Sequence, residues 1–291
     1  MPQDHRLPAQ RFELKYLIDE AITPGIRDFV SCHLELDEYG VGWPDQAYSV
    51  HTLYLDSDDL KTYQAASNGS KNRFKLRLRY YDDNPLAPVF FEVKARQDNC
   101  IIKQRCPVRR EAVPLLIAGQ LPEAGHVFSK EARHFATLQK FNLLQHQLNA
   151  RPKVHNHYFR EAWASPHDNA LRVTIDRRVE IEPHFLANAV TELSNPRRVF
   201  AGIVILELKF GMRFPDWMRE LVRRFNLMQF SASKYSEGIL LLGEHRFHDG
   251  DFAFDWEGWM PRQRERGSSS ARSKSHRSFH TAELPETSIY E

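Results

Sequence analysis

The 291-residue sequence lacks several features that would assign it to a class at once. It has no run of about 18 apolar residues, so we expect no transmembrane segment. Its first residues hold no apolar stretch of the kind that a secretory signal needs. It has three cysteines and no CxxC pair, which argues against a disulfide framework or a zinc ribbon and is typical of a reducing compartment. We therefore expect a cytoplasmic protein.

An excess of charge of one sign is also missing. The sequence has 40 Lys and Arg against 38 Asp and Glu, a formal net charge of +2. This balance removes the simplest argument for a nucleic-acid partner, and we expect none. Apolar residues make up 42% and aromatic residues 12%, which is ordinary for a folded domain. If charge carries the function, it must do so by its placement.

Common catalytic motifs are absent as well. There is no GxxxxGK followed by Ser or Thr, no HExxH and no evident Ser/His/Asp arrangement. The 14 histidines, including His155 and His157 on one predicted strand, lack a Cys or His partner at metal-binding spacing. We interpret them as surface or core residues.

The chain divides by composition into three parts. Residues 1–10 form an N-terminal extension, residues 11–245 a densely patterned domain, and residues 246–291 a tail. The tail is rich in Ser, Arg and His and has almost no apolar periodicity beyond Trp256 and Trp259. We expect it to be largely disordered, because it cannot bury enough surface to offset its chain entropy.

Alternation of apolar and polar residues predicts many strands and few helices. Helix signals are Thr23-Pro24, for a helix to about residue 36, Ser57 as a cap, Ser129, for a helix to about residue 148, and Pro215-Asp216. The pattern predicts an α+β fold that is mainly antiparallel β, with the helices packed outside. The predicted strands cover residues 11–18, 49–55, 74–81, 89–95, 101–109, 153–162, 171–181 and 203–210.

The polar faces of these strands are mostly cationic. In residues 74–79, Lys75, Arg77 and Arg79 share one face and the leucines take the other, because successive strand residues point to opposite sides. A solvated face explains this for any single strand. Six strands do it together, and neighbouring cations repel one another without an anion. We therefore predict a sheet closed into a β-barrel tunnel with a basic bore. The other face-sharing sets are Glu13 and Lys15; Glu92, Lys94 and Arg96; Lys103 and Arg105; Arg172 and Asp176; and Glu207 and Lys209.

A basic bore suits a polyanion. Arg presents a fork of donors to phosphate oxygens and Lys supplies a movable point charge. Interspersed carboxylates such as Glu207 can hold Mg²⁺ or Mn²⁺, which share oxygen ligands with phosphates. Phosphoryl transfer needs mainly positioning and neutralisation of charge, which this lining supplies.

Several motifs in residues 11–243, taken in their order along the chain, resemble the catalytic domain of the vacuolar transporter chaperone (VTC) polyphosphate polymerase. That domain is a triphosphate tunnel metalloenzyme of the CYTH-like superfamily. The segments that carry the resemblance are residues 13–16, 49–56, 75–80, 91–94, 151–153, 158–160, 172–176, 206–209, 215–222 and 233–235.

The resemblance implies a set of tunnel residues. The metal-binding carboxylate would be Glu207, for Mn²⁺ or Mg²⁺. Lys103 and Arg105 are alternatives for one phosphate contact, because the spacing after Lys94 leaves the alignment ambiguous. The implied catalytic cations are Arg77, Arg79, Lys94, Arg160, Arg172, Lys209 and Lys234, and the implied substrate-binding residues are Lys15, Lys75, Lys103, Arg105 and Tyr158.

The same resemblance implies the activity: transfer of the γ-phosphate of ATP to a growing polyphosphate chain inside the tunnel. ATP and polyphosphate would be the partners, and a membrane protein a further one. The hydrolytic branch of the superfamily begins with ExExK, whereas this register reads Arg11, Glu13, Lys15. The replacement of the first carboxylate by a cation favours the polymerase over a triphosphatase.

Three alternatives remain open at this point. The first is an inorganic or organic triphosphatase of the same fold. The second is a non-catalytic module that binds polyphosphate or RNA, against which Glu92 and Glu207 argue, since simple anion capture needs no carboxylate. The third is a structural β protein with solvated basic faces.

Overall fold

The computed structural model describes residues 12–43, 45–98, 100–166, 171–231 and 233–247. The predicted N-terminal extension at 1–10, Arg11 and residues 248–291 of the predicted tail lie outside this description. None of the described helices combines the length and the apolar character needed to cross a membrane.

One antiparallel sheet holds the described residues together. All eight predicted strands are confirmed, with ends within two residues of those expected. Two-residue strands, β2 (Glu35–Leu36) and β9 (Arg197–Arg198), pair with β7 and β8. The long strands are β1 (Phe12–Asp19), β3 (Ala47–Asp56), β4 (Arg73–Tyr80), β5 (Val89–Gln97), β6 (Cys100–Val108), β7 (Arg151–Ala164), β8 (Arg172–Pro183) and β10 (Ile203–Phe210).

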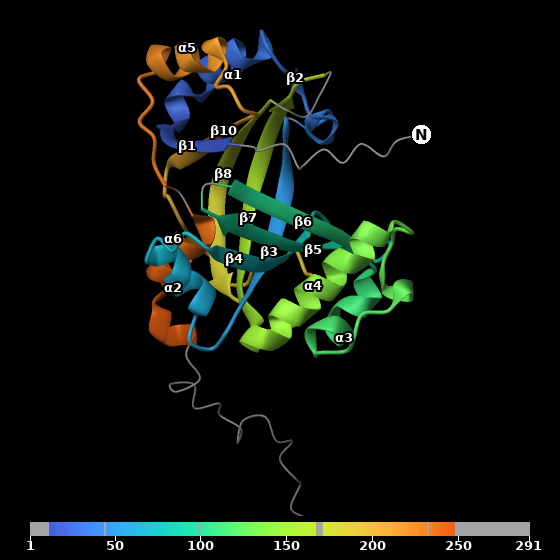
Figure 1. The fold of residues 1–291 in the computed structure, drawn as a ribbon. Helices are drawn as coiled ribbons and strands as arrows, with labels where there is room; N and C mark the ends of the chain where they lie inside the picture. Colours follow the sequence, from blue (N-terminus) through green and yellow to red (C-terminus); the bar gives the residue numbers. More distant parts are fainter. Residues whose placement is uncertain (1–11, 44, 99, 167–170, 232, 248–291) are drawn as a thin grey trace, which may run out of the picture. The chain divides into compact units, whose positions relative to one another are not determined.

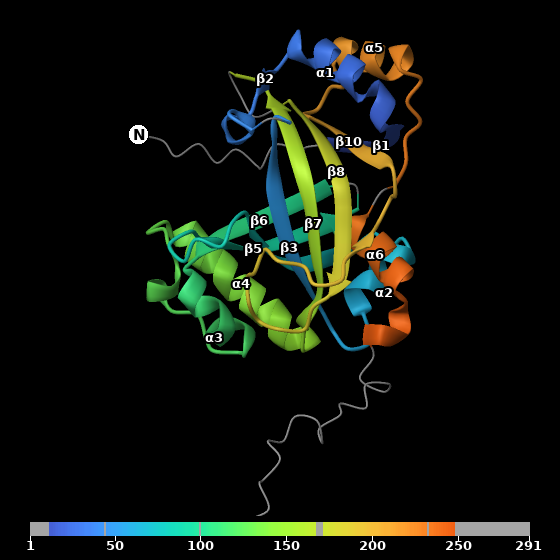
Figure 2. The ribbon, with the colours of Figure 1, turned by 180° about the vertical axis from the view of Figure 1, so that it is seen from behind.

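The sheet curls so that its two ends face one another. Its order is β1-β10-β8-β7-β3-β4-β5-β6, and β4, β5 and β6 cross β3, β7 and β8 in Figures 1 and 2. The α+β, mainly antiparallel class is confirmed. Closure differs from the expectation: among the described residues no strand pairing joins β1 to β6, so the sheet is a half-barrel. Side chains span the gap instead, with Lys94 Nζ of β5 lying 3.5 Å from Glu13 Oε2 of β1.

Six α-helices of the described residues accompany the sheet. The helix predicted from Thr23 ends at Ser31, because the chain turns back and residues 35–36 form β2. The predicted helices near Ser57, Ser129 and Pro215 are confirmed, whereas α3 and α6 were not expected. The helices are α1 (Thr23–Ser31), α2 (Lys61–Ser67), α3 (Val113–Ile117), α4 (Ala132–Leu148), α5 (Asp216–Arg224) and α6 (Lys234–Leu242).

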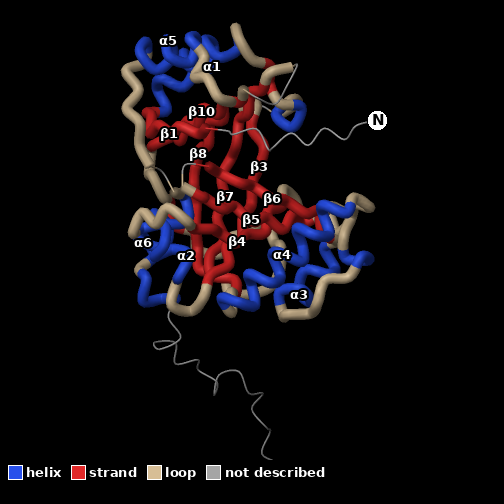
Figure 3. The backbone as a smooth tube through the Cα atoms, in the orientation of Figure 1, coloured by secondary structure: helices blue, strands red, loops and turns tan. Residues whose placement is uncertain are grey.

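Two pairs of helices cover the convex face of the sheet (Figure 3). Helices α3 and α4 pack on β4, β5 and β6, where Phe91 meets Phe141 at a ring distance of 4.8 Å. Helices α1 and α5 pack on β1, β8 and β10, where Ile26 and Met218 join the core around Leu208. Each fully buried side chain of this size contributes about 1.5–3 kcal/mol. These helices thus bury the apolar side chains on the convex face of the strands.

Helix α6 contradicts the expectation that the helices pack outside the bore. Tyr235 and Ile239 of α6 pack on Tyr158 and Ile205, which point to the concave face. The approach is close at Gly238, where an added Cβ would lie 2.0 Å from Cδ1 of Ile181. Helix α6 therefore covers one end of the concave face and presents Lys234 to it.

A single buried carboxylate joins β3, α2 and α6. Asp56 accepts hydrogen bonds from the backbone N–H groups of Ser57, Thr62 and Tyr63 at 2.9, 2.9 and 3.0 Å. It also accepts from the Thr62 hydroxyl and from the Tyr235 hydroxyl, each at 2.7 Å. Ser57, the predicted cap, is not the N-cap residue, which is Leu60, but its Oγ accepts from the N–H of Lys61. Asp56 thus fixes the first turn of α2 and the first turn of α6 to the end of β3.

Candidate functional site

The charged side chains of the long strands share the concave face, as the alternation predicted. Strand register sets Lys15 opposite Glu207, Arg77 opposite Glu92, and Lys75 opposite Lys94. We call the concave-face side chains of β1, β8 and β10, with Lys234 of α6, the Glu207 wall. We call those of β4, β5 and β6 the Glu92 wall. Strands β3 and β7 lie between the two.

Glu207 lies among four cations. Its carboxylate is 2.7 Å from Lys209, 3.3 Å from Lys15, and 3.7 Å from both Lys234 and Arg160. Burial by itself would raise the pKa of Glu207, but the three lysines and Arg160 hold it well below its ordinary value. The carboxylate is therefore ionised and retains the negative charge that a divalent cation requires.

Asp176 is the second buried carboxylate of this wall. Arg160 donates to it through Nε and Nη2, both at 2.7 Å, and Lys234 donates at 2.6 Å. These cations keep the pKa of Asp176 lowered despite burial, which acts in the opposite direction. Sequence reasoning placed Asp176 in a motif and gave it no role. Its position four residues after Arg172 on one strand face was the available signal.

Glu13 completes the carboxylates of the Glu207 wall. It pairs with Lys15 at 3.2 Å and, across the gap of the sheet, with Lys94 at 3.5 Å. Burial raises its pKa, and Lys94 and Lys15 more than reverse this and lower it to about 2. The wall therefore combines three carboxylates with several cations.

The Glu92 wall has one carboxylate. Glu92 is fully buried, and Arg77, Lys103 and Arg105 approach it within 2.6, 2.8 and 3.2 Å. Burial would raise the pKa of Glu92, and Arg77, Arg79 and Lys103 lower it well below its ordinary value. No second carboxylate of the described residues lies within ion-pair distance of these three cations.

Cations outnumber carboxylates on the concave face, and burial together with repulsion between the cations lowers the pKa values of several lysines. Burial, then Lys94 and Lys15, lower the pKa of Lys75 to about 7. Burial also lowers the pKa of Lys103 to about 7, although Glu92 acts against it. Glu13 raises the pKa of Lys94, but burial and the charges of Lys15 and Arg77 outweigh it. A bound anion would relieve this repulsion.

The floor between the walls is buried and aromatic. Arg79 Nη2 lies 3.2 Å from the Tyr158 hydroxyl, and Lys234 lies 4.6 Å from the centre of the Tyr158 ring. Tyr54, which sequence reasoning missed, shares this face. Burial would raise its pKa, and Arg77 and Arg79 lower it. Both tyrosines sit where a phosphate would contact these arginines.

Most of the residues that the sequence singled out therefore meet on one surface. Arg172 is the exception in its contacts: its guanidinium pairs with Asp37, which precedes the short 3₁₀ turn Glu38–Gly40. It faces the same side as Lys209, its strand neighbour, but its charge is already neutralised. The residues brought together on the walls and floor are Lys15, Lys75, Arg77, Arg79, Lys94, Lys103, Arg105, Tyr158, Arg160, Glu207, Lys209 and Lys234.

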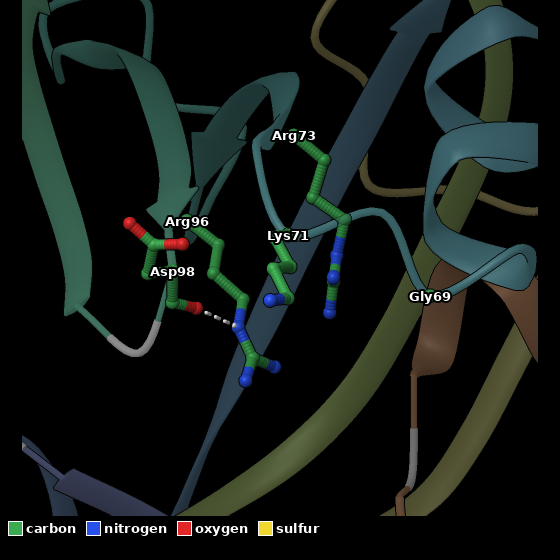
Figure 4. Close-up of a pocket in the computed structure, with 5 residues that line it drawn as sticks. All are labelled: Gly69, Lys71, Arg73, Arg96 and Asp98. Atoms are coloured by element: carbon green, nitrogen blue, oxygen red, sulfur yellow. Dashed lines mark hydrogen bonds between the residues drawn. The ribbon is translucent and has the colours of Figure 1, made fainter.

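The positive surface continues past Lys75 and Lys94. Arg73 and Arg96 are direct strand partners there, and with Lys71 and Asp98 they line a pocket of about 300 Å³. Figure 4 shows Arg96, Lys71 and Arg73 extending in the same direction, with Arg96 Nε bonded to the backbone oxygen of Asp98 at 2.8 Å. Burial and the charge of Arg96 lower the pKa of Arg73. The pocket extends the row of cations beyond the start of β4.

The curled antiparallel sheet thus carries a cation-lined concave face with buried carboxylates, and its Arg and Lys side chains are of the kinds that suit phosphate oxygens. Residues 10–243 match the family described as "VTC domain", and the chain belongs to that family. The chain is 22% identical, over 209 residues, to vacuolar transporter chaperone complex subunit 4 of Schizosaccharomyces pombe. The match covers 60% of this chain and 29% of that relative, so the chain spans under a third of the relative's length.

A solved structure was also matched. It is the structure of the PH1819 protein from Pyrococcus horikoshii, with 12% identity and a TM-score of 0.39. The match covers 80% of this chain and 99% of that one. At this TM-score the likeness adds nothing to the description of the fold or the site.

Proposed function

We propose that this protein transfers the γ-phosphate of ATP to a growing inorganic polyphosphate chain on its concave face. The observation that carries the proposal is the excess of buried cations there, with two lysines whose pKa values are lowered to about 7. Such a surface binds an extended polyanion well, because each phosphate relieves repulsion between neighbouring cations. Membership of the VTC domain family supports the same assignment.

The residues of this chain divide the work by position. Arg77 and Arg79 of the Glu92 wall and Arg160 from β7 would neutralise the equatorial oxygens of the transferred phosphoryl group. An oxygen of the terminal chain phosphate would form the new P–O bond as the bond to ADP breaks. That acceptor is ionised at neutral pH, so no general base is needed. The pocket of Arg73, Arg96 and Lys71 would hold chain phosphates further from the reacting centre.

The donor set also suits a divalent cation. Mg²⁺ and Mn²⁺ bind one or two carboxylates and take their other ligands from phosphates and water. Glu207 would hold the ion, and Asp176 and Glu13, which interact electrostatically with Glu207, would add negative charge nearby. When bound, the ion would add positive charge on the phosphate oxygens. Lys15 and Lys209, which now contact Glu207, would turn to the phosphates.

The test is product analysis with tag-free full-length protein, ATP and Mn²⁺ or Mg²⁺. The proposal expects long-chain polyphosphate on a gel and ADP in equal molar amount to the phosphate added. Orthophosphate alone would instead identify a triphosphatase of the same fold. Tight polyphosphate binding without nucleotide turnover would identify a binding module.

A membrane partner is proposed on narrower grounds. The S. pombe relative is named as a subunit of a transporter chaperone complex. We propose that this chain likewise works with a membrane protein, to be tested by co-purification of the tagged chain from detergent-solubilised membranes. Recovery only in the fraction without membranes would contradict this.

A further inference from the structure

The sequence showed no metal-binding partner for His155, but strand pairing brings other possible ligands close to it. His155 of β7 is the direct strand partner of Glu182 of β8, and His184 follows two residues later. Each of the three offers one ligand atom, and these atoms lie within 4.8 Å of one another. Asn156 and Val154 are the strand partners of Thr52 and Tyr54, which face the bore. Because successive strand residues point to opposite sides, His155, which lies between Asn156 and Val154, points to the convex face.

Hydrogen bonds leave a bare nitrogen on His155. The Tyr80 hydroxyl donates its hydrogen to the backbone oxygen of Val190 at 2.8 Å, so towards His155 Nε2, at 3.1 Å, it acts as an acceptor. Nε2 of His155 also lies 3.1 Å from His51 Nδ1, and a hydrogen on Nε2 has both of these atoms as acceptors when His51 carries its own hydrogen on Nε2. Nδ1 is fully buried and has no hydrogen-bond partner among the described residues. A neutral ring with its lone pair on Nδ1 avoids the cost of a buried, unpaired N–H.

His184 and Glu182 are oriented in the same manner. His184 Nε2 donates to Asn188 Oδ1 at 2.5 Å, which places the lone pair of the neutral ring on Nδ1. Glu182 Oε2 accepts from the N–H of Asn195 at 2.9 Å, which leaves Oε1 for another ligand. Outer hydrogen bonds of this kind fix the tautomer and direction of metal-ligating side chains.

We propose that His155, Glu182 and His184 form a Zn²⁺ site on the convex face, separate from the concave site. Two imidazole nitrogens and a carboxylate are a donor set that Zn²⁺ takes with water in the fourth position. Ligand atoms of a tetrahedral Zn²⁺ lie roughly 3.4 Å apart, for bonds of about 2.1 Å. His184 is half-buried and lies just beyond β8. A small rotation of its side chain would bring the ligand atoms, which now lie within 4.8 Å of one another, to this spacing.

The ion would fasten the segment between β8 and β9, residues 184–196, to the sheet. That segment is otherwise held by separate contacts, such as Tyr80 to Val190 and Asp83 to the N–H of Thr191. Removal of the metal is expected to lower the melting temperature and to raise hydrogen exchange in this segment. Neither effect requires the proposed enzymatic activity.

The test uses tag-free full-length protein stripped with EDTA and titrated with Zn²⁺ by calorimetry and with Co²⁺ by visible absorption. Since loss of outer partners alone costs about 10- to 100-fold in metal affinity, Glu182→Gln and His184→Gln should each weaken Zn²⁺ binding at least tenfold. His134→Gln on α4 and Glu207→Gln on the concave face are controls, which should retain wild-type Zn²⁺ affinity.

The expected result is one Zn²⁺ per chain, tetrahedral Co²⁺ bands, and a melting temperature that Zn²⁺ raises in the wild type and in both controls. Zn²⁺ binding of equal strength in wild type, Glu182→Gln and His184→Gln would overturn the proposal. So would Zn²⁺ affinity that falls with Glu207→Gln, or no Zn²⁺ binding by the wild type.

Discussion

The two walls of the concave face contain the same residue types but arrange them differently. Glu207 lies with Asp176 and Glu13 in a group of three carboxylates interleaved with cations. Glu92 is a single carboxylate enclosed by Arg77, Lys103 and Arg105. The Glu207 wall thus offers several carboxylates to the metal ion that we propose there. In the Glu92 wall the carboxylate serves to gather cations. Strand alternation alone does not distinguish these two roles.

The largest expected effect comes from Glu207→Gln. It keeps the shape of the side chain but removes the charge that would hold the divalent ion, so polymer synthesis should fall by roughly 100-fold or more. Circular dichroism should be unchanged, and polyphosphate formation and ADP release should be measured over a range of Mn²⁺ concentrations. Wild-type synthesis with unchanged metal dependence would remove Glu207 from the mechanism.

The matched change on the other wall is Glu92→Gln. It leaves Arg77, Lys103 and Arg105 without their buried counter-charge, so the free energy of unfolding should fall by about 3 kcal/mol. Tripolyphosphate should restore much of this loss, because it replaces the missing negative charge. Urea unfolding with and without tripolyphosphate measures both. If Glu92→Gln and Glu207→Gln respond alike to tripolyphosphate, the two walls do not differ as we infer.

A smaller effect is expected from Gly238→Ala, which acts on the Glu207 wall through α6. The new Cβ would meet Ile181 Cδ1, and overpacking of this kind costs about 1–3 kcal/mol. Displacement of α6 should also weaken the contact of Lys234 with Asp176 and lower activity. Gly211→Ala is the control, since an added Cβ there meets nothing within 4 Å. Equal unfolding midpoints for the two variants would contradict the close packing of α6 on Ile181.

The smallest effect is the pH dependence of anion binding at the Glu92 wall. A bound phosphate raises the pKa of Lys75 above about 7, so binding takes up a proton and weakens as pH rises from 6.5 to 8.5. The affinity of Lys75→Met for tripolyphosphate should change several-fold less over this pH range than the affinity of the wild type. Lys130→Met, an exposed lysine, is the control for net charge. Parallel pH profiles for wild type and Lys75→Met would show that Lys75 is charged throughout.

Local pattern predicted much of this molecule. The period of two in residues 74–79 is enough to put Lys75, Arg77 and Arg79 on one face and to identify the strand itself. The same rule placed Asp176 on the face of Arg172, although it assigned Asp176 no role. Helix signals at Thr23-Pro24 and Pro215-Asp216 located the starts of α1 and α5, because caps are local too.

What failed depends on contacts between distant segments. The open edge between β1 and β6, the seating of α6 on the concave face and the pairing of Arg172 with Asp37 each join residues far apart in the chain. The position of His155 beside Glu182 follows from the register of β7 on β8, which includes an irregularity between residues 157 and 159. No local spacing contains that information.

The Asp56 carboxylate has a consequence for the mobility of Lys234. It binds the first turn of α2 and the hydroxyl of Tyr235, and Tyr235 directly follows Lys234. Lys234 therefore cannot leave Asp176 by a large motion of α6 unless hydrogen bonds at Asp56 break as well. The first turns of α2 and α6 should then exchange their amide hydrogens as one cooperative unit, at a rate set by Asp56. Through these bonds, a carboxylate at the end of β3 restrains the movement of Lys234 on the concave face.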